Sequence, residues 1–103
     1  MRSEQFKDWL INSNRLSSKK STSDAPSRCN RIEKIPGIDL DAEYARDGGF
    51  RLIEMLTYTA ADEREHRSVP TELEFSPASN LRNGMASLKN AAKLYFEFCR
   101  SNN

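Results

Sequence analysis

Apolar side chains recur every three or four residues across the segment 81–99, and this pattern constrains the fold more than any other feature of the chain. The apolar residues are Leu81, Met85, Leu88, Ala92, Tyr95, Phe96 and Cys99. Such spacing places them on one face of an α-helix for about five turns. Ser79 or Asn80 precedes the segment and can cap the helix. The segment therefore predicts a long amphipathic helix.

Two helices are expected before residue 36. Phe6, Trp9 and Leu10 predict a helix over residues 4–13, with Ser3 as its N-cap. Ala25, Cys29 and Ile32 predict a second helix that ends near residue 34, before Pro36 and Gly37. Pro26 is tolerated only in the first turn of a helix, so the cap of this second helix should be Asp24 or Ala25.

The middle of the chain predicts shorter elements. A short extra helix is expected between residues 38 and 47, with Leu40, Tyr44 and Ala45 facing inward. After a break at Gly48-Gly49, a helix over residues 50–61 is expected to turn one side to the core. The residues on that side are Phe50, Ile53, Leu56 and Ala60. Two prolines and clustered charges predict a mobile loop around 62–78. Strand patterns are nearly absent, so the fold class is all-α with four main helices.

Length and composition limit the chain to one domain over residues 1–103. Only 37% of the residues are hydrophobic, which predicts a small core. No apolar run is long enough to cross a membrane, and residues 1–5 lack the apolar core of a signal peptide. We therefore expect a cytoplasmic protein without a membrane partner. In that compartment Cys29 and Cys99 should be reduced and buried.

The same composition argues against catalysis. His66 is the single histidine, and the chain has only three Cys and His residues, too few for a structural zinc site. Phosphate-binding glycine motifs and the GxSxG nucleophile motif are missing. His66 lies among charged residues and is interpreted as a solvated loop side chain rather than a general base. We expect no enzyme activity, cofactor, metal or small-molecule substrate.

The net charge of +1 hides a segregation of charge along the chain. Residues 1–35 carry a net charge of +4, residues 36–75 carry −6, and residues 76–103 carry +3. If the two basic ends pack together, they form one positive face, which a nucleic acid could bind. The alternative is that these charges belong to ordinary solvated helix faces.

Four segments, residues 6–10, 16–19, 23–34 and 80–98, carry a family resemblance. Together they resemble the N-terminal, SAM-like core-binding domain of tyrosine recombinases, the phage integrase family. The resemblance implies a small orthogonal bundle of four main helices. It departs from the family at Ala25, where the family has an aromatic residue, and in the turn before the second helix. The family's catalytic domain has no counterpart here, so strand-exchange chemistry is not expected.

What the resemblance implies is double-stranded DNA binding by a non-catalytic module. Such a module is either standalone or the front part of a larger mobile-element or restriction-type protein, with a role in DNA recombination. In the family, the second and fourth helices contact phosphates and grooves. The positions that match here are Lys19, Lys20, Ser21, Thr22, Arg28, Arg31, Asn80, Arg82, Asn83, Lys89 and Lys93.

A second hypothesis is a small helical protein–protein interaction module, such as a phage- or plasmid-type adaptor or inhibitor. SAM-like folds also bind proteins, and the acidic middle segment would suit a basic partner. An exposed patch around Tyr44, Tyr58 or Phe75 would favour this alternative.

Overall fold

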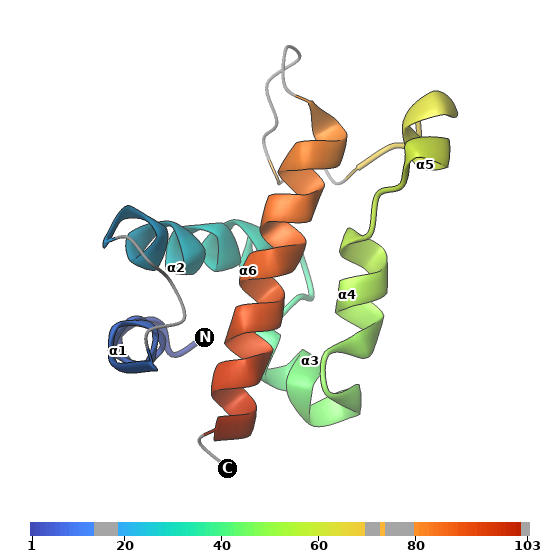
Figure 1. Ribbon diagram of the computed structural model, residues 1–103. Coiled ribbons are helices and arrows are strands. Elements are labelled where there is room, and N and C mark those ends of the chain that lie inside the picture. The colour runs from blue at the N-terminus through green and yellow to red at the C-terminus, as the bar shows by residue number, and fades with distance from the viewer. Residues whose placement is uncertain (14–18, 70–72, 74–79, 102–103) are drawn as a thin grey trace.

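The computed structural model describes residues 1–13, 19–69, 73 and 80–101, and these ranges contain helices but no strands (Figure 1). Its helices are α1 (Ser3–Ser13), α2 (Lys19–Glu33), α3 (Leu40–Asp47), α4 (Phe50–Leu56), α5 (Ala60–Arg64) and α6 (Leu81–Ser101). The all-α prediction is therefore confirmed for the described part of the chain. None of the helices in these ranges is long and apolar enough to cross a membrane.

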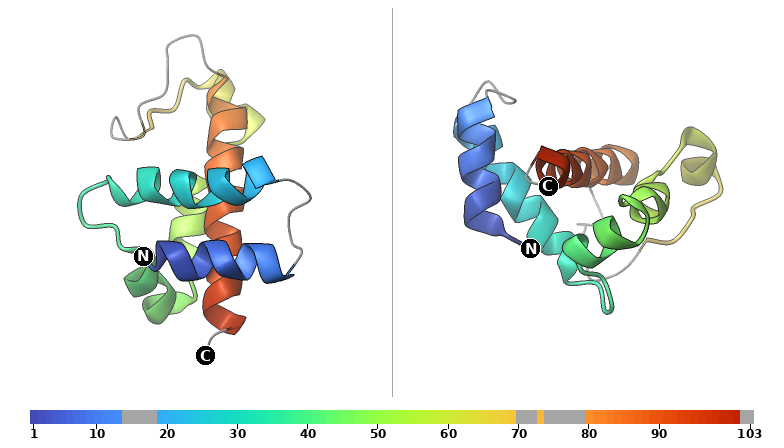
Figure 2. Two further views of the ribbon diagram at one scale, coloured as in Figure 1. Left: turned by 90° about the vertical axis from the view of Figure 1, so that its left-hand side faces the viewer. Right: turned by 90° about the horizontal axis from the view of Figure 1, so that it is seen from below.

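Helix α6 runs through the middle of the molecule, with α1 and α2 on one side and α3 and α4 on the other (Figures 1 and 2). Its buried residues are Met85, Leu88, Ala91, Ala92, Tyr95, Phe96, Phe98 and Cys99. The long amphipathic helix is thus confirmed. Of its two candidate caps, Asn80 serves, because its side-chain oxygen accepts a hydrogen bond from the Asn83 amide at 3.2 Å. Ser79 lies outside the described residues.

Aromatic rings join α1 to α6. The Phe6 ring lies 5.1 Å from the Tyr95 ring and 5.6 Å from the Phe98 ring, and Trp9 lies 6.0 Å from Phe98. Such pairs contribute about 0.5–1.5 kcal/mol each beyond the area they bury. The predicted cap of α1 is wrong by one position. The helix includes Ser3, and the carbonyl of Arg2 accepts its first hydrogen bond, from the Phe6 amide at 2.9 Å.

Helix α2 begins at Lys19, so the predicted start at Asp24 or Ala25 is wrong. Pro26 lies inside the helix, where the missing amide and the ring cost about 3 kcal/mol. Burial offsets this cost, because α2 makes the most extensive contacts with α6 and buries the predicted stripe. That stripe is Ala25, Cys29 and Ile32. Tertiary packing therefore overrides the local preference of proline.

Helix α3 matches the expected short helix, and Asp39 explains where it begins. Asp39 caps it by accepting hydrogen bonds from the Asp41 and Ala42 amides. The inward residues were only partly predicted. Leu40 is buried and Tyr44 is half-buried, but Ala45 is exposed. Glu43 takes a buried position instead, with its carboxylate 3.4 Å from the Arg46 guanidinium.

The predicted helix over residues 50–61 is divided in two. Helix α4 ends at Leu56, and Thr59 caps the new helix α5. The Thr59 hydroxyl accepts from the Asp62 amide at 3.1 Å, while the Asp62 carboxylate accepts from the Thr59 amide at 2.9 Å. This reciprocal capping box satisfies backbone amides at the start of a helix, so it marks Thr59 as the beginning of α5 rather than the interior of a continuous helix. Ala60 is consequently exposed rather than inward.

The capping box also affects the segment expected to be a loop. Helix α5 reaches Arg64, so the beginning of the segment 62–78 is helical. Residues 70–72 and 74–79 lie outside the described residues. The backbone hydrogen bond from Thr59 is the main cause that lowers the pKa of Asp62.

Both cysteines are free and buried, as the sequence predicts. Cys29 packs between α2 and α6, and its thiol lies 3.5 Å from the Ala91 carbonyl. Burial raises the pKa of Cys29 to about 12.

Candidate functional site

Four basic residues form a stripe along the solvent side of α6. Arg82, Lys89, Lys93 and Arg100 follow one another at spacings of seven, four and seven residues. At 3.6 residues per turn these spacings return to nearly the same side of a helix. None of the four belongs to the buried face of α6; Lys89 is half-buried and the other three are exposed. We call this set the α6 basic stripe. It extends over about 27 Å at 1.5 Å per residue.

The charge of the stripe is only weakly neutralised by described residues. The Arg82 guanidinium lies 3.6 Å from the Glu63 carboxylate of α5, and both side chains are about half exposed. A pair in that setting contributes little, because solvent screens it. Within the described ranges no ion pair joins Lys89, Lys93 or Arg100 to another residue. Glu97 is the single acidic residue of α6, so the helix carries a clear positive excess.

The predicted residues of the second helix lie elsewhere. Lys19, Lys20, Ser21 and Thr22 form the first turn of α2, and their side chains lie outside the described part of the structure. This turn lies on the α1 side of α6, away from α4 (Figures 1 and 2). Lys93 and Arg100, in contrast, line a hollow beside α4. The predicted contact residues therefore fall into two groups.

The remaining predicted residues have distinct surroundings. Arg28 and Arg31 are both half-buried on α2, and the Arg31 guanidinium donates a hydrogen bond to the Leu73 carbonyl. Asn80 and Asn83 are exposed at the start of α6, where the Asn80 side chain is engaged as the helix cap. Arg82, Lys89 and Lys93 are thus the predicted residues that share one face, and Arg100 joins them although it was not predicted.

Part of the basic N-terminal segment is bound to the acidic middle. The N-terminal ammonium lies 3.5 Å from the carboxylates of Glu33 and Asp41, and the Arg2 guanidinium lies 3.2 Å from Asp41. The Tyr95 hydroxyl donates to Asp41 at 2.6 Å and accepts from the Arg2 amide at 3.0 Å. We call Arg2, Asp41 and Tyr95 the Asp41 cluster. It joins the N-terminus, α3 and α6, so Arg2 serves the fold rather than a positive face.

The Asp41 cluster shifts the titration of its members. Burial alone would raise the pKa of Asp41, but the hydrogen bond from Tyr95 and the charges of the N-terminus and Arg2 lower it overall. Burial and the hydrogen bond to Asp41 raise the pKa of Tyr95 well above its usual range. The cluster therefore favours an ionised carboxylate beside a protonated phenol.

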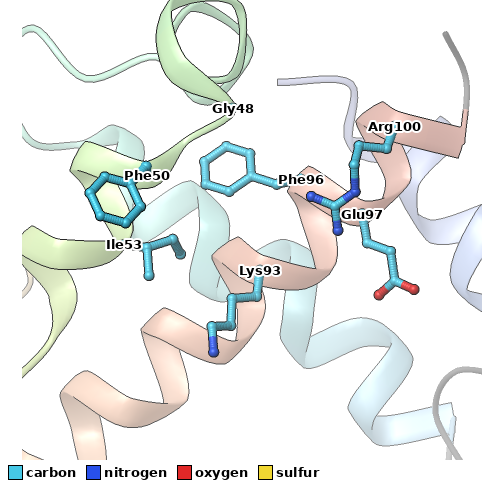
Figure 3. A pocket seen from close by; sticks show the side chains of 7 residues that line it. All are labelled: Gly48, Phe50, Ile53, Lys93, Phe96, Glu97 and Arg100. Carbon is cyan, nitrogen blue, oxygen red and sulfur yellow. The ribbon is translucent and has the colours of Figure 1, made fainter.

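A hollow of about 430 Å³ lies between α4 and α6, next to the stripe (Figure 3). Its lining residues are Gly48, Phe50, Ile53, Lys93, Phe96, Glu97 and Arg100. The expectation that Phe50 faces the core is wrong, because 64% of its surface is exposed. The buried residues of α4 are Leu52 and Leu56, and Phe50, two residues before Leu52, lies about 200° from it around the helix.

An exposed patch around Tyr44, Tyr58 or Phe75 would favour a protein partner, and neither Tyr44 nor Tyr58 is exposed. Tyr58 is 8% exposed, and its hydroxyl donates to the Arg67 carbonyl at 2.8 Å. Tyr44 is half-buried and stacks on Phe96 with 6.2 Å between the ring centres. Phe75 lies outside the described residues. Among the described residues, Phe50 is an exposed aromatic residue that the apolar spacing had assigned to the core.

The described residues contain no group of three or more potential metal ligands among His, Cys, Asp and Glu. His66 is exposed and has a positive φ of 54° after the end of α5.

Comparison with protein-family models, with curated proteins and with solved structures finds no match to this chain.

Proposed function

We propose that this chain is a non-catalytic module that binds double-stranded DNA through the α6 basic stripe. The resemblance to the core-binding domain of tyrosine recombinases suggested a DNA ligand. The α6 basic stripe supports this proposal because it is a positively charged surface that DNA phosphates could contact. We also propose that the helices form a SAM-like orthogonal bundle, as the resemblance implies. The way α2 crosses α6 in Figure 1 agrees with such an arrangement.

The single observation that carries the proposal is the alignment of four basic residues on the unburied side of the longest helix. Phosphates follow one another along each DNA strand, and a row of cations on a straight helix matches such a row of anions. Arg82, Lys93 and Arg100 are exposed and Lys89 is half-buried, so a ligand can approach the row without disturbing the core. Asn83, exposed at the start of the same helix, adds a neutral hydrogen-bonding side chain.

The number of cations sets the expected dependence on salt. Four phosphate contacts give a slope of about −3.6 in the logarithm of the association constant against the logarithm of salt concentration. Between 50 and 200 mM salt this slope corresponds to a loss of affinity of about 150-fold. Contacts of this kind position a protein on DNA without selecting a sequence. We therefore expect weak sequence preference from the stripe.

Fluorescence anisotropy with a labelled DNA duplex tests the proposal over that salt range. Lys89→Gln removes one cation from the middle of the stripe, and it should weaken binding and lower the slope by about 0.9. Lys7→Gln is the matched control, because Lys7 is an exposed lysine on α1. A duplex that does not bind at low salt, or equal effects of the two substitutions, would refute the assignment to α6.

A further inference from the structure

We propose that the hollow between α4 and α6 binds an acidic peptide segment that carries one aromatic or large aliphatic side chain. The proposal goes beyond DNA binding and does not depend on it. Its basis is that an apolar wall, with Phe50 as its exposed member, and two cations line the same hollow between the two helices (Figure 3).

The apolar wall consists of Phe50 and Ile53 from α4 and Phe96 from α6. Phe50 is 64% exposed, whereas Ile53 is half-buried and Phe96 is buried. In Figure 3 the Phe96 ring points toward Phe50 across the hollow. An apolar side chain inserted there would cover Phe50 and extend the aromatic packing that Phe96 makes with Tyr44. The hollow has about 430 Å³ of space, enough for such a side chain and part of a peptide backbone.

The cations select the charge of the peptide. Lys93 and Arg100 stand seven residues apart on the α6 side of the hollow, and both are exposed. They can meet carboxylates on either side of the inserted side chain, about 10 Å apart along the helix axis. Charge complementarity of this kind fixes the orientation of a ligand and raises the rate of encounter.

One carboxylate of the protein also lines the hollow and must be accounted for. Glu97 lies between the two cations in sequence, and it is half-buried. Figure 3 shows its carboxylate directed away from Phe50 and Ile53. The lining therefore carries two positive charges and one negative charge, and the negative charge is directed away from the apolar wall.

Lys93 and Arg100 belong to both the hollow and the α6 basic stripe. A peptide that occupies the hollow would neutralise two of the four stripe cations. Where the chain also binds DNA, the acidic peptide and the duplex compete, which would let a partner protein control release from DNA. Phe50 belongs to the hollow alone, and Lys89 belongs to the stripe alone. Substitutions at these two residues therefore separate the two binding events.

The test is an NMR titration of the ¹⁵N-labelled full chain with three short synthetic peptides. The first has a central phenylalanine flanked by aspartates and glutamates, the second replaces that phenylalanine by alanine, and the third replaces the acidic residues by lysine. We expect saturable shifts from the first peptide, centred on residues 48–53 and 93–100. The alanine peptide should bind about tenfold more weakly or worse, and the lysine peptide should not bind there.

Three substitutions sharpen the result. Phe50→Ala should weaken the first peptide about tenfold while leaving the amide spectrum of the core unchanged, since Phe50 is largely exposed. Ile11→Ala, at an apolar residue of α1 that is 55% exposed, is the matched control and should have no effect. Lys89→Gln should spare peptide binding.

Absence of saturable shifts from the first peptide would overturn the proposal. Equal affinity for the phenylalanine and alanine peptides would overturn it as well, because the cations alone would then account for binding. If Phe50→Ala instead weakens duplex or single-stranded DNA and the peptide does not bind, the hollow stacks a nucleobase and the peptide assignment is wrong. Failure of DNA binding alone leaves these outcomes unaffected.

Discussion

Gly48 and Gly49 form a matched pair that tests the packing between the α3–α4 turn and α6. Both have a positive φ, 73° and 87°, so an alanine at either position must adopt a left-handed conformation. That conformation costs an L-residue about 1–2 kcal/mol. The two sites differ in space. A Cβ atom at Gly48 meets nothing within 4 Å, whereas one at Gly49 would overlap the Phe96 ring.

The overlap sets the expected difference between the two substitutions. Phe96 is 2% exposed and stacks on Tyr44, so its ring can yield only by losing that contact or by turning into the hollow beside Phe50. Forcing a buried side chain to move in this way costs about 1–3 kcal/mol. Gly48→Ala should therefore lower the free energy of unfolding by about 1–2 kcal/mol. Gly49→Ala should lower it by about 2–5 kcal/mol.

Urea unfolding, followed by circular dichroism and by Trp9 fluorescence, measures both losses. The double variant Gly49→Ala, Phe96→Leu provides the control, because a smaller side chain removes the overlap. The loss from Gly49→Ala should shrink by about 1 kcal/mol or more in the Phe96→Leu background. Equal losses for the two glycine variants, or no coupling between Gly49 and Phe96, would refute the close packing of this turn on α6.

Three further outcomes follow from the core. Tyr95→Phe removes the hydroxyl between Asp41 and the Arg2 amide, and urea unfolding should show a loss of about 1.5–3 kcal/mol, since one partner is charged. Because the folded pKa of Asp41 is lowered, its contribution to stability is present above the unfolded value of 3.8 and is lost as the pH falls through the folded pKa. Thermal unfolding from pH 5 to pH 2 should show this loss, and Asp41→Asn should make the profile shallower. Burial and a pKa of about 12 should make Cys29 unreactive to a thiol reagent at pH 8 in the native state, with reaction only at the rate of unfolding.

Helices were predictable from the sequence where the spacing of apolar residues is sufficient to indicate them. The apolar residues from Leu81 to Cys99 predicted α6 because they lie on one face of the helix, and that face is the buried one. The same logic predicted the buried stripe of α2 at Ala25, Cys29 and Ile32. It failed at the start of α2, because the local penalty of Pro26 is visible in the sequence while the compensating contact with α6 is not.

The break between α4 and α5 has a local signal in the sequence. Thr59 followed three residues later by Asp62 has the form of a capping box, with aspartate in the place of the usual glutamate. An apolar pattern that continues through such a pair does not prove a continuous helix. The exposure of Phe50 has a different cause, because the buried side of α4 is formed by Leu52 and Leu56 and Phe50 lies on another side of the helix.

The candidate site was predictable only along one helix. Arg82, Lys89 and Lys93 were assigned to DNA contact from the resemblance, and their common side follows from spacing within α6. Whether residues of α2 join them depends on the direction in which α2 crosses α6, and no local pattern contains that direction. The structure starts α2 on the α1 side, so its first turn and the hollow beside α4 are separate surfaces (Figure 2).

The separation of these surfaces changes what the charge segregation means. Of the basic residues near the N-terminus, Arg2 is held by Asp41 and Arg31 by the Leu73 carbonyl, so both act within the fold. The C-terminal cations, in contrast, line up on one helix and stand beside an exposed aromatic residue. We proposed that a DNA duplex binds the whole α6 basic stripe and that an acidic peptide with an apolar side chain binds the hollow at its end. Two such ligands differ in more than charge, because only the peptide needs the apolar wall. The two proposals therefore make ligand choice at α6 depend on Phe50, a residue that contributes nothing to the net charge.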